Sequence, residues 1–444
     1  MTDASAQTQR TSDETPNAAY ANYALRLLFV VMILNFLDRQ IIAVLAEPVK
    51  RDLGLSDTQV GLMSGLSFSI FYTTLGLPIA ALSDRWNRRR IIAISLTIWS
   101  TMTVLCGMAG NFVQLFLARV GVGVGEAGSG PASHSLIADL FPPERRASAL
   151  GFYGMSIPIG AFIAYAGGGW VVENLGWRMA FVLAGAPGLL VAVVVMLTIR
   201  EPRGTTPLSQ VFKPDPTRVS LKDALAELSR KSAYWHLIAS GAFVQFVAYG
   251  ASSFYGSFFV RTHGMSYAEF GLKLGIMVGI VGAFASWIGG RWGDKLAQRS
   301  HGAPLYANAA TMVLSVPIMI AGLNVADPNL AFVLFAAPTF AGTYYFGSTY
   351  AGVQKLARDE TRAVAVAIYL LLASLIGLGL GPLFVGVLSD AFAGASPTPA
   401  DEASALRSAI TVLAFFNIWG GVHFWLSGRK MADDMTKEPE AAAA

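Results

Sequence analysis

The chain has 444 residues, of which 54% are hydrophobic and only 14% are charged. An average soluble domain is about 25% charged, and a soluble protein of this length with so few charges could not cover its surface with polar groups. The composition excludes a disordered chain, a coiled coil and an ordinary cytosolic enzyme, and indicates a protein that crosses a membrane several times. The net charge of +4 is weak evidence for nucleic-acid binding, because basic residues gather in the cytoplasmic loops of membrane proteins.

Twelve apolar segments are long enough to cross a membrane as helices, which takes roughly 20 residues each. They cover residues 24–46, 60–82, 91–109, 112–139, 147–169, 179–199, 233–260, 269–290, 304–323, 329–353, 363–389 and 408–428. The segments lack the alternating pattern of membrane barrel strands. The sequence therefore predicts an all-α membrane protein with twelve transmembrane helices.

The basic residues predict how this chain is oriented. With the N-terminus inside, 24 of the 32 Lys and Arg residues fall on the cytoplasmic side and 6 fall outside. This bias predicts that both termini are cytoplasmic. Short loops and the lack of an Asn-x-Ser/Thr sequon favour the inner (plasma) membrane of a bacterium.

The chain divides into two similar halves. We expect a cytoplasmic tail (1–23), a six-helix bundle (24–199), a cytoplasmic linker (200–232) with an amphipathic stretch at 221–228, a second six-helix bundle (233–428) and a disordered cytoplasmic tail (429–444). Asp84 after the second span and Asp294 after the eighth are 210 residues apart, while Arg146 and Arg362 are 216 apart. Two matches near one period indicate a duplicated six-helix unit, and hence two pseudo-symmetric bundles with a site between them.

Two sets of motifs resemble known families. The Asp-Arg-x-x-Arg-Arg loop at 84–89 resembles the signature loop of the major facilitator superfamily. Residues 35–39, 119–127 and 136–141 resemble the spinster family, whose members are lipid transporters of this superfamily. This second match covers residues 30–203. It implies the major facilitator fold, a cavity lined by the first and fourth spans, and an amphipathic lipid as substrate.

Four charged residues lie inside the predicted spans, namely Asp38, Arg39, Arg119 and Glu126. Charges at that depth are costly and usually mark function. Arg119 and Glu126 are seven residues apart, so they share a helix face, roughly 10 Å apart along the axis. One arginine between two carboxylates predicts proton coupling by Asp38, Glu126 and Arg119, with Arg119 also a head-group ligand. The alternative is a static ion network. Arg39 is left with three roles: pairing with Asp38, contacting substrate or facing another span.

The helix interiors of the second half contain no Asp, Glu, Lys or Arg. A cavity between the halves would then have one charged wall and one apolar, aromatic wall, which suits an amphipathic substrate. The candidate substrate-binding residues are Arg119, Asn35, Arg39, Gln245, Tyr249, Tyr344 and Tyr345. Any of these tyrosines could instead serve packing or the membrane interface.

The loop charges predict a gate that closes the cytoplasmic side. Its candidate residues are Asp84, Arg85, Arg88, Asp139, Arg145, Arg146 and Asp294. The alternative is that the basic residues only set the orientation, which would not require the aspartates.

These patterns together predict a secondary transporter that works by alternating access. We expect proton coupling, with a lysophospholipid or sphingoid-type lipid as substrate. A proton gradient would supply the energy, with no cofactor, and the five histidines lack metal-ligand spacing. Expected partners are the substrate, protons and membrane lipids, without nucleic acid, and the protein would be a monomer. One rival is a transporter of small organic anions or drugs. Another is a membrane enzyme or receptor, which the lack of a nucleophile–base motif opposes.

Overall fold

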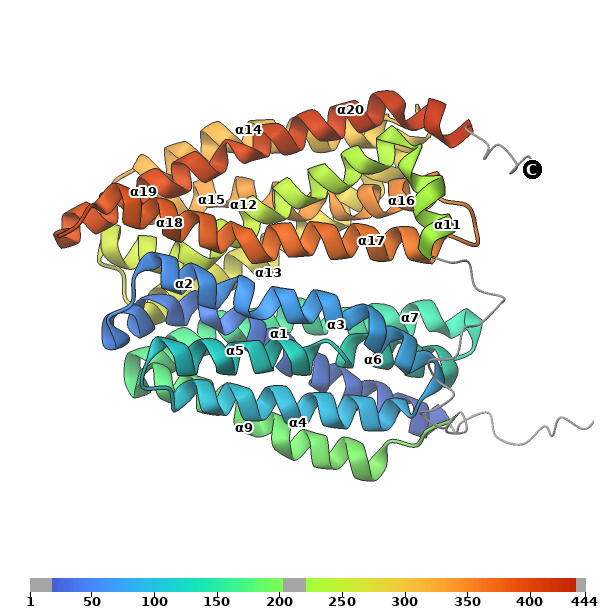
Figure 1. The fold of residues 1–444 in the computed structure, drawn as a ribbon, viewed down its shortest axis with the longest axis horizontal. Helices are drawn as coiled ribbons and strands as arrows, with labels where there is room; N and C mark the ends of the chain where they lie inside the picture. Colours follow the sequence, from blue (N-terminus) through green and yellow to red (C-terminus); the bar gives the residue numbers. More distant parts are fainter. Residues whose placement is uncertain (1–17, 203–220, 437–444) are drawn as a thin grey trace, which may run out of the picture.

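The computed structural model describes residues 18–202 and 221–436, which fold into helices without any strand. Figure 1 shows two helical bundles side by side, one from the part of the chain before residue 203 and one from the part after residue 220. Residues 1–17, 203–220 and 437–444, which include most of the predicted linker and both extreme tails, lie outside the described part.

Within each of the two described ranges, short connections join one helix to the next. The first bundle contains α1 (Ala18–Leu53), α2 (Asp57–Ser64), α3 (Leu66–Arg85), α4 (Arg88–Gly107), α5 (Phe112–Glu126), α6 (Ser129–Leu140), α7 (Pro143–Gly154), α8 (Ser156–Phe162), η1 (Ile163–Gly167) and α9 (Gly168–Thr198). The second part contains α11 (Leu221–Ser229), α12 (Ser232–His263), α13 (Tyr267–Ala297), α14 (Ala303–Asn324), α15 (Pro328–Tyr344), α16 (Phe346–Leu356), α17 (Arg362–Ser374), η2 (Leu375–Leu380), α18 (Gly381–Ala393), α19 (Pro399–Ala414) and α20 (Phe416–Thr436).

These helices make twelve membrane spans. In the described part, nine helical stretches are long and apolar enough to cross a membrane. Pro143–Thr198 has 56 residues, and one straight helix of that length would measure about 84 Å, far more than a bilayer core. Gly176, with a φ of 82°, divides it into two spans. The pairs α2–α3 and α5–α6 each form one further span from two short helices, so the predicted count of twelve is confirmed.

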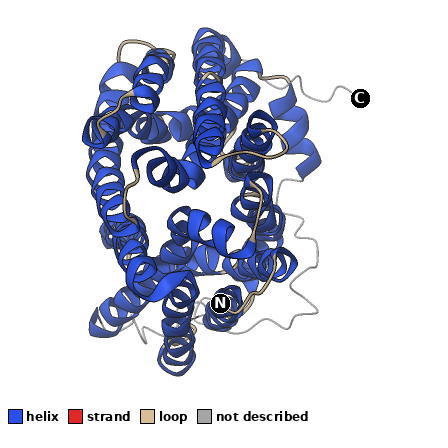
Figure 2. Cartoon of the chain, turned by 90° about the vertical axis from the view of Figure 1, so that its left-hand side faces the viewer, coloured by secondary structure: helices blue, strands red, loops and turns tan. Residues whose placement is uncertain are grey.

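The bundles have two distinct ends. We call the end where α2, α13 and α19 begin the Asp57 end, on the left of Figure 1, and the opposite end, which carries α11, the linker end. Figure 2 looks along the helices from the Asp57 end and shows both bundles end-on.

The tail after the last span is ordered further than predicted. The sequence predicts disorder from residue 429, whereas α20 continues to Thr436. Asp434 is fully buried and accepts a hydrogen bond of 2.6 Å from the backbone N–H of Ala233. This contact satisfies an amide in the first turn of α12, which otherwise has no partner within its helix, and it explains why the helix continues.

Glycines bring the two bundles close together near the Asp57 end. A Cβ added at Gly61 of α2 would collide with the carbonyl oxygen of Pro382 in α18, and one at Gly271 of α13 would collide with that of Tyr165 in η1. Gly61 and Gly271 are 210 residues apart, the same offset as Asp84 and Asp294. The duplicated unit therefore builds two equivalent glycine contacts between the halves.

We expect Gly271→Leu to hold the Asp57 end open, because the added side chain has no space in the closed arrangement. Overpacking costs about 1–3 kcal/mol, or roughly tenfold in the balance between open and closed states. The measurement is labelling of a cysteine at Ser252, which lines the central cavity, by an impermeant maleimide added at the Asp57 end. Gly290→Leu on the same helix is the control, because a Cβ there meets open space. Equal labelling of both variants would contradict this packing argument.

Candidate functional site

The four charged residues predicted inside the spans form one cluster between α1 and α5. Asp38, Arg119 and Glu126 are 1–2% exposed. Nη2 and Nε of Arg39 donate to Oε2 of Glu126 at 2.7 and 3.2 Å, while Nη1 of Arg119 lies 3.8 Å from Oδ1 of Asp38. The cluster thus has two arginines and two carboxylates, where the sequence predicted one arginine between two carboxylates.

Arg39 faces another span rather than pairing with Asp38. Besides its bonds to Glu126, its guanidinium lies 4.3 Å from the ring centre of Tyr72 and 5.0 Å from that of Phe68, both on α3. Asn35, one turn earlier on α1, accepts from Arg39 at a long 3.5 Å. Of the three roles left open for Arg39, the structure shows the contact with a neighbouring span.

Asp38 and Arg119 face each other, and their hydrogen-bonding groups are only partly used in the described structure. Oδ2 of Asp38 is hydrogen-bonded to the Thr103 hydroxyl of α4. Within the described residues, Oδ1 of Asp38 and Nε and Nη1 of Arg119 are buried without a hydrogen-bond partner. Buried donors without partners are costly, so this part of the cluster is suited to a ligand or a proton.

A pocket lies close to this cluster, mostly within the second bundle, and its space of about 960 Å³ includes a part that is open to solvent. Its wall is formed mainly by uncharged tyrosine, amide and hydroxyl side chains with apolar residues between them. The polar lining residues are Gln40, Tyr165, Gln245, Tyr249, Ser252, Tyr255, Thr339, Thr343, Tyr345 and Asn417. Gln40 on the cavity wall directly follows Arg39 on α1, and Tyr249 on the opposite bundle interacts electrostatically with Arg39. The cavity therefore lies close to the Arg39 side of the cluster.

The predicted substrate residues fall into two groups. Gln245, Tyr249 and Tyr345 line the cavity. Asn35, Arg39 and Arg119 belong to the ionic cluster. Tyr344 is buried with its ring stacked on Phe340 and is not among the lining residues. Substrate contact by any of these residues stays a prediction.

Sequence reasoning missed two residues of the first bundle that reach this cavity. The Tyr165 hydroxyl donates to Oε1 of Gln40 at 3.0 Å, and both side chains line the cavity. Gln40 lies two residues after Asp38, so a polar side chain in an apolar span was the available signal. Tyr165 carries no such signal, since tyrosine is common in packed helices.

Three of the predicted gate residues at the linker end, Arg88, Asp139 and Arg146, make contacts within the first bundle. Arg88 is 1% exposed and pairs with Asp139 and Glu201. Nη2 of Arg146 donates to the carbonyl of Ala138 at 2.7 Å. Arg145 is exposed, and Asp294 lines a separate pocket in the second bundle. The side chains of Asp84 and Arg85 lie outside the described part, so closure by these residues stays a prediction.

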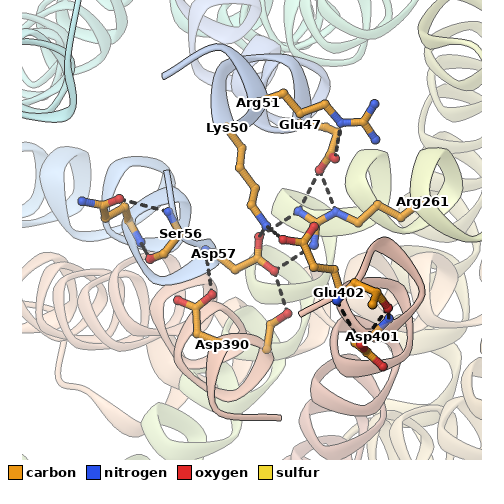
Figure 3. A network of polar contacts seen from close by, with 12 residues as sticks. Glu47, Lys50, Arg51, Ser56, Asp57, Arg261, Asp390, Asp401 and Glu402 are labelled. Carbon is orange, nitrogen blue, oxygen red and sulfur yellow. Dashed lines mark hydrogen bonds and ion pairs between the residues drawn. The ribbon is translucent and has the colours of Figure 1, made fainter. Parts of the chain in front are cut away.

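The Asp57 end carries an ionic network that sequence reasoning missed (Figure 3). Arg261 of α12 donates two bonds of 2.8 Å to the carboxylate of Asp57 and one of 2.8 Å to Glu47. Lys50 lies 3.0 Å from Asp57 and 3.3 Å from Glu402 of α19. These contacts join α1 and α2 of the first bundle to α12 and α19 of the second.

Asp390 adds a helix cap to the same network. Its carboxylate accepts from the backbone N–H groups of Asp57 and Thr58 at 3.0 and 2.8 Å, at the start of α2. The Ser389 hydroxyl donates to Asp57 at 2.6 Å. A carboxylate at a helix N-terminus is favourable, and this one comes from the other bundle. The network therefore closes the Asp57 end.

The predicted amphipathic stretch at 221–228 is the helix α11, held by one buried acid. Glu227 accepts from Nε of Arg358 at 2.9 Å, from the N–H of Arg358 at 3.1 Å and from the Thr361 hydroxyl at 2.9 Å. Burial alone would raise the pKa of Glu227, but the bonds to Arg358 and Thr361 outweigh it and hold this pKa below its usual value of 4.5.

We expect acid to loosen the contact of α11 with the second bundle. Because the pKa of Glu227 is lower in the folded state, its stabilising effect is complete above the unfolded value of 4.5 and is lost as pH falls through the lowered value. The protection of the α11 amides, measured as their exchange relative to the intrinsic rate at the same pH, should fall below that pH. At neutral pH, Glu227→Gln should quicken this exchange about tenfold, since a charged hydrogen-bond acceptor is lost. Asp359→Asn, in the loop between α16 and α17 that holds Arg358 and Thr361, is the control. An unchanged exchange rate in Glu227→Gln would refute this role.

Comparison with known proteins shows which protein family has this arrangement. The sequence matches the Major Facilitator Superfamily over residues 28–382. The chain belongs to this superfamily. It is therefore a membrane transporter and not an enzyme, and the predicted resemblance and fold are confirmed.

Relatives within the superfamily include spinster proteins. A crystal structure described as a bacterial homolog of the human lysosomal transporter Spinster, in an inward-facing and unoccupied conformation, has 32% identity, covers 96% of this chain and 100% of that one, and gives a TM-score of 0.86. An MFS-type efflux pump of Mycolicibacterium smegmatis is 35% identical over 95% of this chain and 96% of its own length. Protein spinster homolog 1 of Xenopus tropicalis is 27% identical over 90% of this chain and 78% of its own.

Proposed function

We propose that this major facilitator transporter moves an amphipathic lipid, a lysophospholipid or sphingoid-type lipid, by proton-coupled alternating access. The observation that carries the proposal is a buried ionic cluster that contains the Asp38–Arg119 pair, together with a nearby cavity lined by Gln40 of the same helix as Asp38 and by uncharged tyrosine, amide and hydroxyl groups. An anionic head group suits the arginine, and a hydrocarbon tail suits the uncharged wall. The likeness to spinster proteins supports the same substrate class.

Charge balance couples the proton to the substrate in this proposal. With both carboxylates ionised, the two arginines and two acids of the cluster sum to zero charge. Protonation of Asp38 leaves Arg119 without a counter-charge, because Glu126 is already paired with Arg39. A buried cation without a partner is unfavourable, so the protonated cluster favours an anionic head group. Glu126 is the second proposed carrier, and no cofactor takes part.

The proposed orientation puts both termini and the linker end in the cytoplasm of a bacterium, with the Asp57 end outside. The excess of basic residues near the linker end supports this orientation. The closed Asp57 network then seals the outer side, which corresponds to an inward-facing state. The match to a structure described as inward-facing supports this assignment. We further propose that the transporter works as a monomer, with protons, substrate and membrane lipids as its partners.

Export of drugs or movement of small organic anions is the second candidate function. The 35% identity to a protein named as an MFS-type efflux pump favours export as the direction of transport. The uncharged cavity wall would accept an apolar drug, whereas a compact dianion usually requires more than one basic ligand.

Transport by purified protein in liposomes distinguishes these candidates. Fluorescent lysophosphatidylcholine, a labelled phosphorylated sphingoid base, ethidium and a labelled uronic acid would be offered separately under an imposed proton gradient. We expect saturable, gradient-dependent movement of a lipid probe, with little competition from ethidium or the uronic acid. Gradient-dependent movement of ethidium or the uronic acid, with neither lipid moved, would replace the lipid proposal with the second candidate.

A further inference from the structure

The Thr103 hydroxyl occupies a position between two hydrogen-bond acceptors. Thr103 lies on α4 and is fully buried. Its Oγ1 is hydrogen-bonded to Oδ2 of Asp38 on α1 and lies 2.9 Å from the carbonyl oxygen of Trp99, one turn earlier on α4. Trp99 and Asp38 are themselves 1% exposed, so water does not replace either contact.

One hydroxyl cannot donate to both oxygens at once, because it has a single proton and two lone pairs. When Asp38 is ionised, Thr103 donates to its Oδ2 and the Trp99 carbonyl keeps only its place in the helix ladder. When Asp38 is protonated, its carboxyl O–H donates to Thr103, and Thr103 donates to Trp99 in the i−4 contact common for threonine in helices. Both contacts are hydrogen bonds only in this second arrangement.

We infer that Thr103 is a positioning residue for the proton of Asp38, holding the same carboxyl oxygen in both charge states by exchanging the roles of donor and acceptor. This inference rests on the proposed role of Asp38 as a proton carrier. The proton then arrives and leaves without a rearrangement of α1 against α4, and the carboxylate keeps its orientation toward Arg119.

The other groups around Asp38 act on it through charge. Arg119 and Glu126 face it from α5, Arg39 is its neighbour on α1, and the buried thiol of Cys106 lies one turn beyond Thr103 on α4. Removing the hydroxyl leaves these groups in place. Hydrogen bonds to an ionised acid are stronger than those to a neutral one, so loss of the hydroxyl weakens the ionised form more. The titration of Asp38 should then move to higher pH.

Infrared difference spectroscopy of the purified protein tests this without a known substrate. The C=O band of protonated Asp38 is identified as the pH-dependent carboxyl band that disappears in Asp38→Asn. In Thr103→Val, which keeps the side-chain shape, we expect the midpoint of this band to rise by about one pH unit. The band itself should move to higher wavenumber, because its O–H has lost its acceptor. Thr103→Ser should restore the midpoint and band position of the original protein.

A matched control is Thr73→Val on α3. Thr73 is also buried, and its hydroxyl bonds the carbonyl of Ser69 at 2.6 Å. The Thr73→Val variant should leave the Asp38 band unchanged. An unshifted band in Thr103→Val would overturn the inference while leaving Asp38 as the carrier, and so would an equal shift in Thr103→Ser. If Asp38→Asn removes no pH-dependent carboxyl band, both the inference and the carrier role of Asp38 fail.

Discussion

Asp38→Asn should reduce proton-driven accumulation of the lipid probe to the level of empty vesicles, while exchange of probe across the membrane at equal concentrations continues. Asparagine keeps the shape of the side chain and the contact with Thr103, but it cannot bind or release a proton. Arg119 then lacks its counter-charge at every pH, so substrate binding no longer depends on pH. The measurement compares accumulation and exchange in the same vesicle preparation.

Asp52→Asn is the matched control for this prediction. Asp52 also lies on α1, but its side chain is 46% exposed and pairs with Arg178 at the protein surface. Surface pairs of this kind contribute little, so accumulation should stay near that of the original protein. Continued accumulation by Asp38→Asn, and by the double variant with Glu126→Gln, would show that protons are not carried by this cluster.

Arg261→Gln should open the Asp57 end. Arg261 is the partner of both Asp57 and Glu47, and all three side chains are 2–3% exposed. Removing one partner from a buried ion pair typically costs about 3–5 kcal/mol, and here the cost falls on the closed state, where the acids are buried together. The open state should gain at least about 100-fold. Labelling of a cysteine at Ser252 by an impermeant maleimide added at the Asp57 end measures this change.

Arg51→Gln is the matched control, because it removes a nearby positive charge without removing the buried contacts of the Asp57 network. Arg51 lies on the same helix as Glu47 and pairs with it at 2.9 Å, but its own side chain is 60% exposed. It should leave labelling almost unchanged. If Arg261→Gln and Arg51→Gln label at the same rate, the Asp57 network does not hold this end closed.

The sequence predicted the spans well because hydrophobic length is a local property. It could not place helix ends where distant residues satisfy them. The fixed end of α20 depends on Asp434 reaching the start of α12, about 200 residues away in the chain. The break at Gly176 lies within one long helical stretch and falls in the polar segment that was predicted as a loop between two spans.

The ionic cluster could be predicted because four charges in apolar helices stand out by depth alone. Their pairing could not, since it depends on how α1 and α5 rotate against each other, and Arg39 meets Glu126 only in the packed structure. Tyr344 and Tyr345 show the same limit. They are adjacent, so they point about 100° apart, and only Tyr345 lines the cavity.

The Asp57 network was missed for a different reason. Asp57, Arg261 and Asp390 are separated by 204 and 129 residues in the chain, and each lies near the end of an apolar run. Charges in such positions are expected in any membrane protein. Their role depends on docking of one bundle against the other, which no local pattern in the sequence contains.

The central claim, that substrate and proton move together through the Asp38 cluster, is tested most directly by substrate-induced proton flux. Vesicles containing the purified protein and an internal pH dye receive lysophosphatidylcholine or the phosphorylated sphingoid base without any imposed gradient. We expect a saturable change of internal pH with the original protein, which is absent with Asp38→Asn and present with Asp52→Asn. Transport of the lipid probe by the original protein without any proton movement would contradict the account.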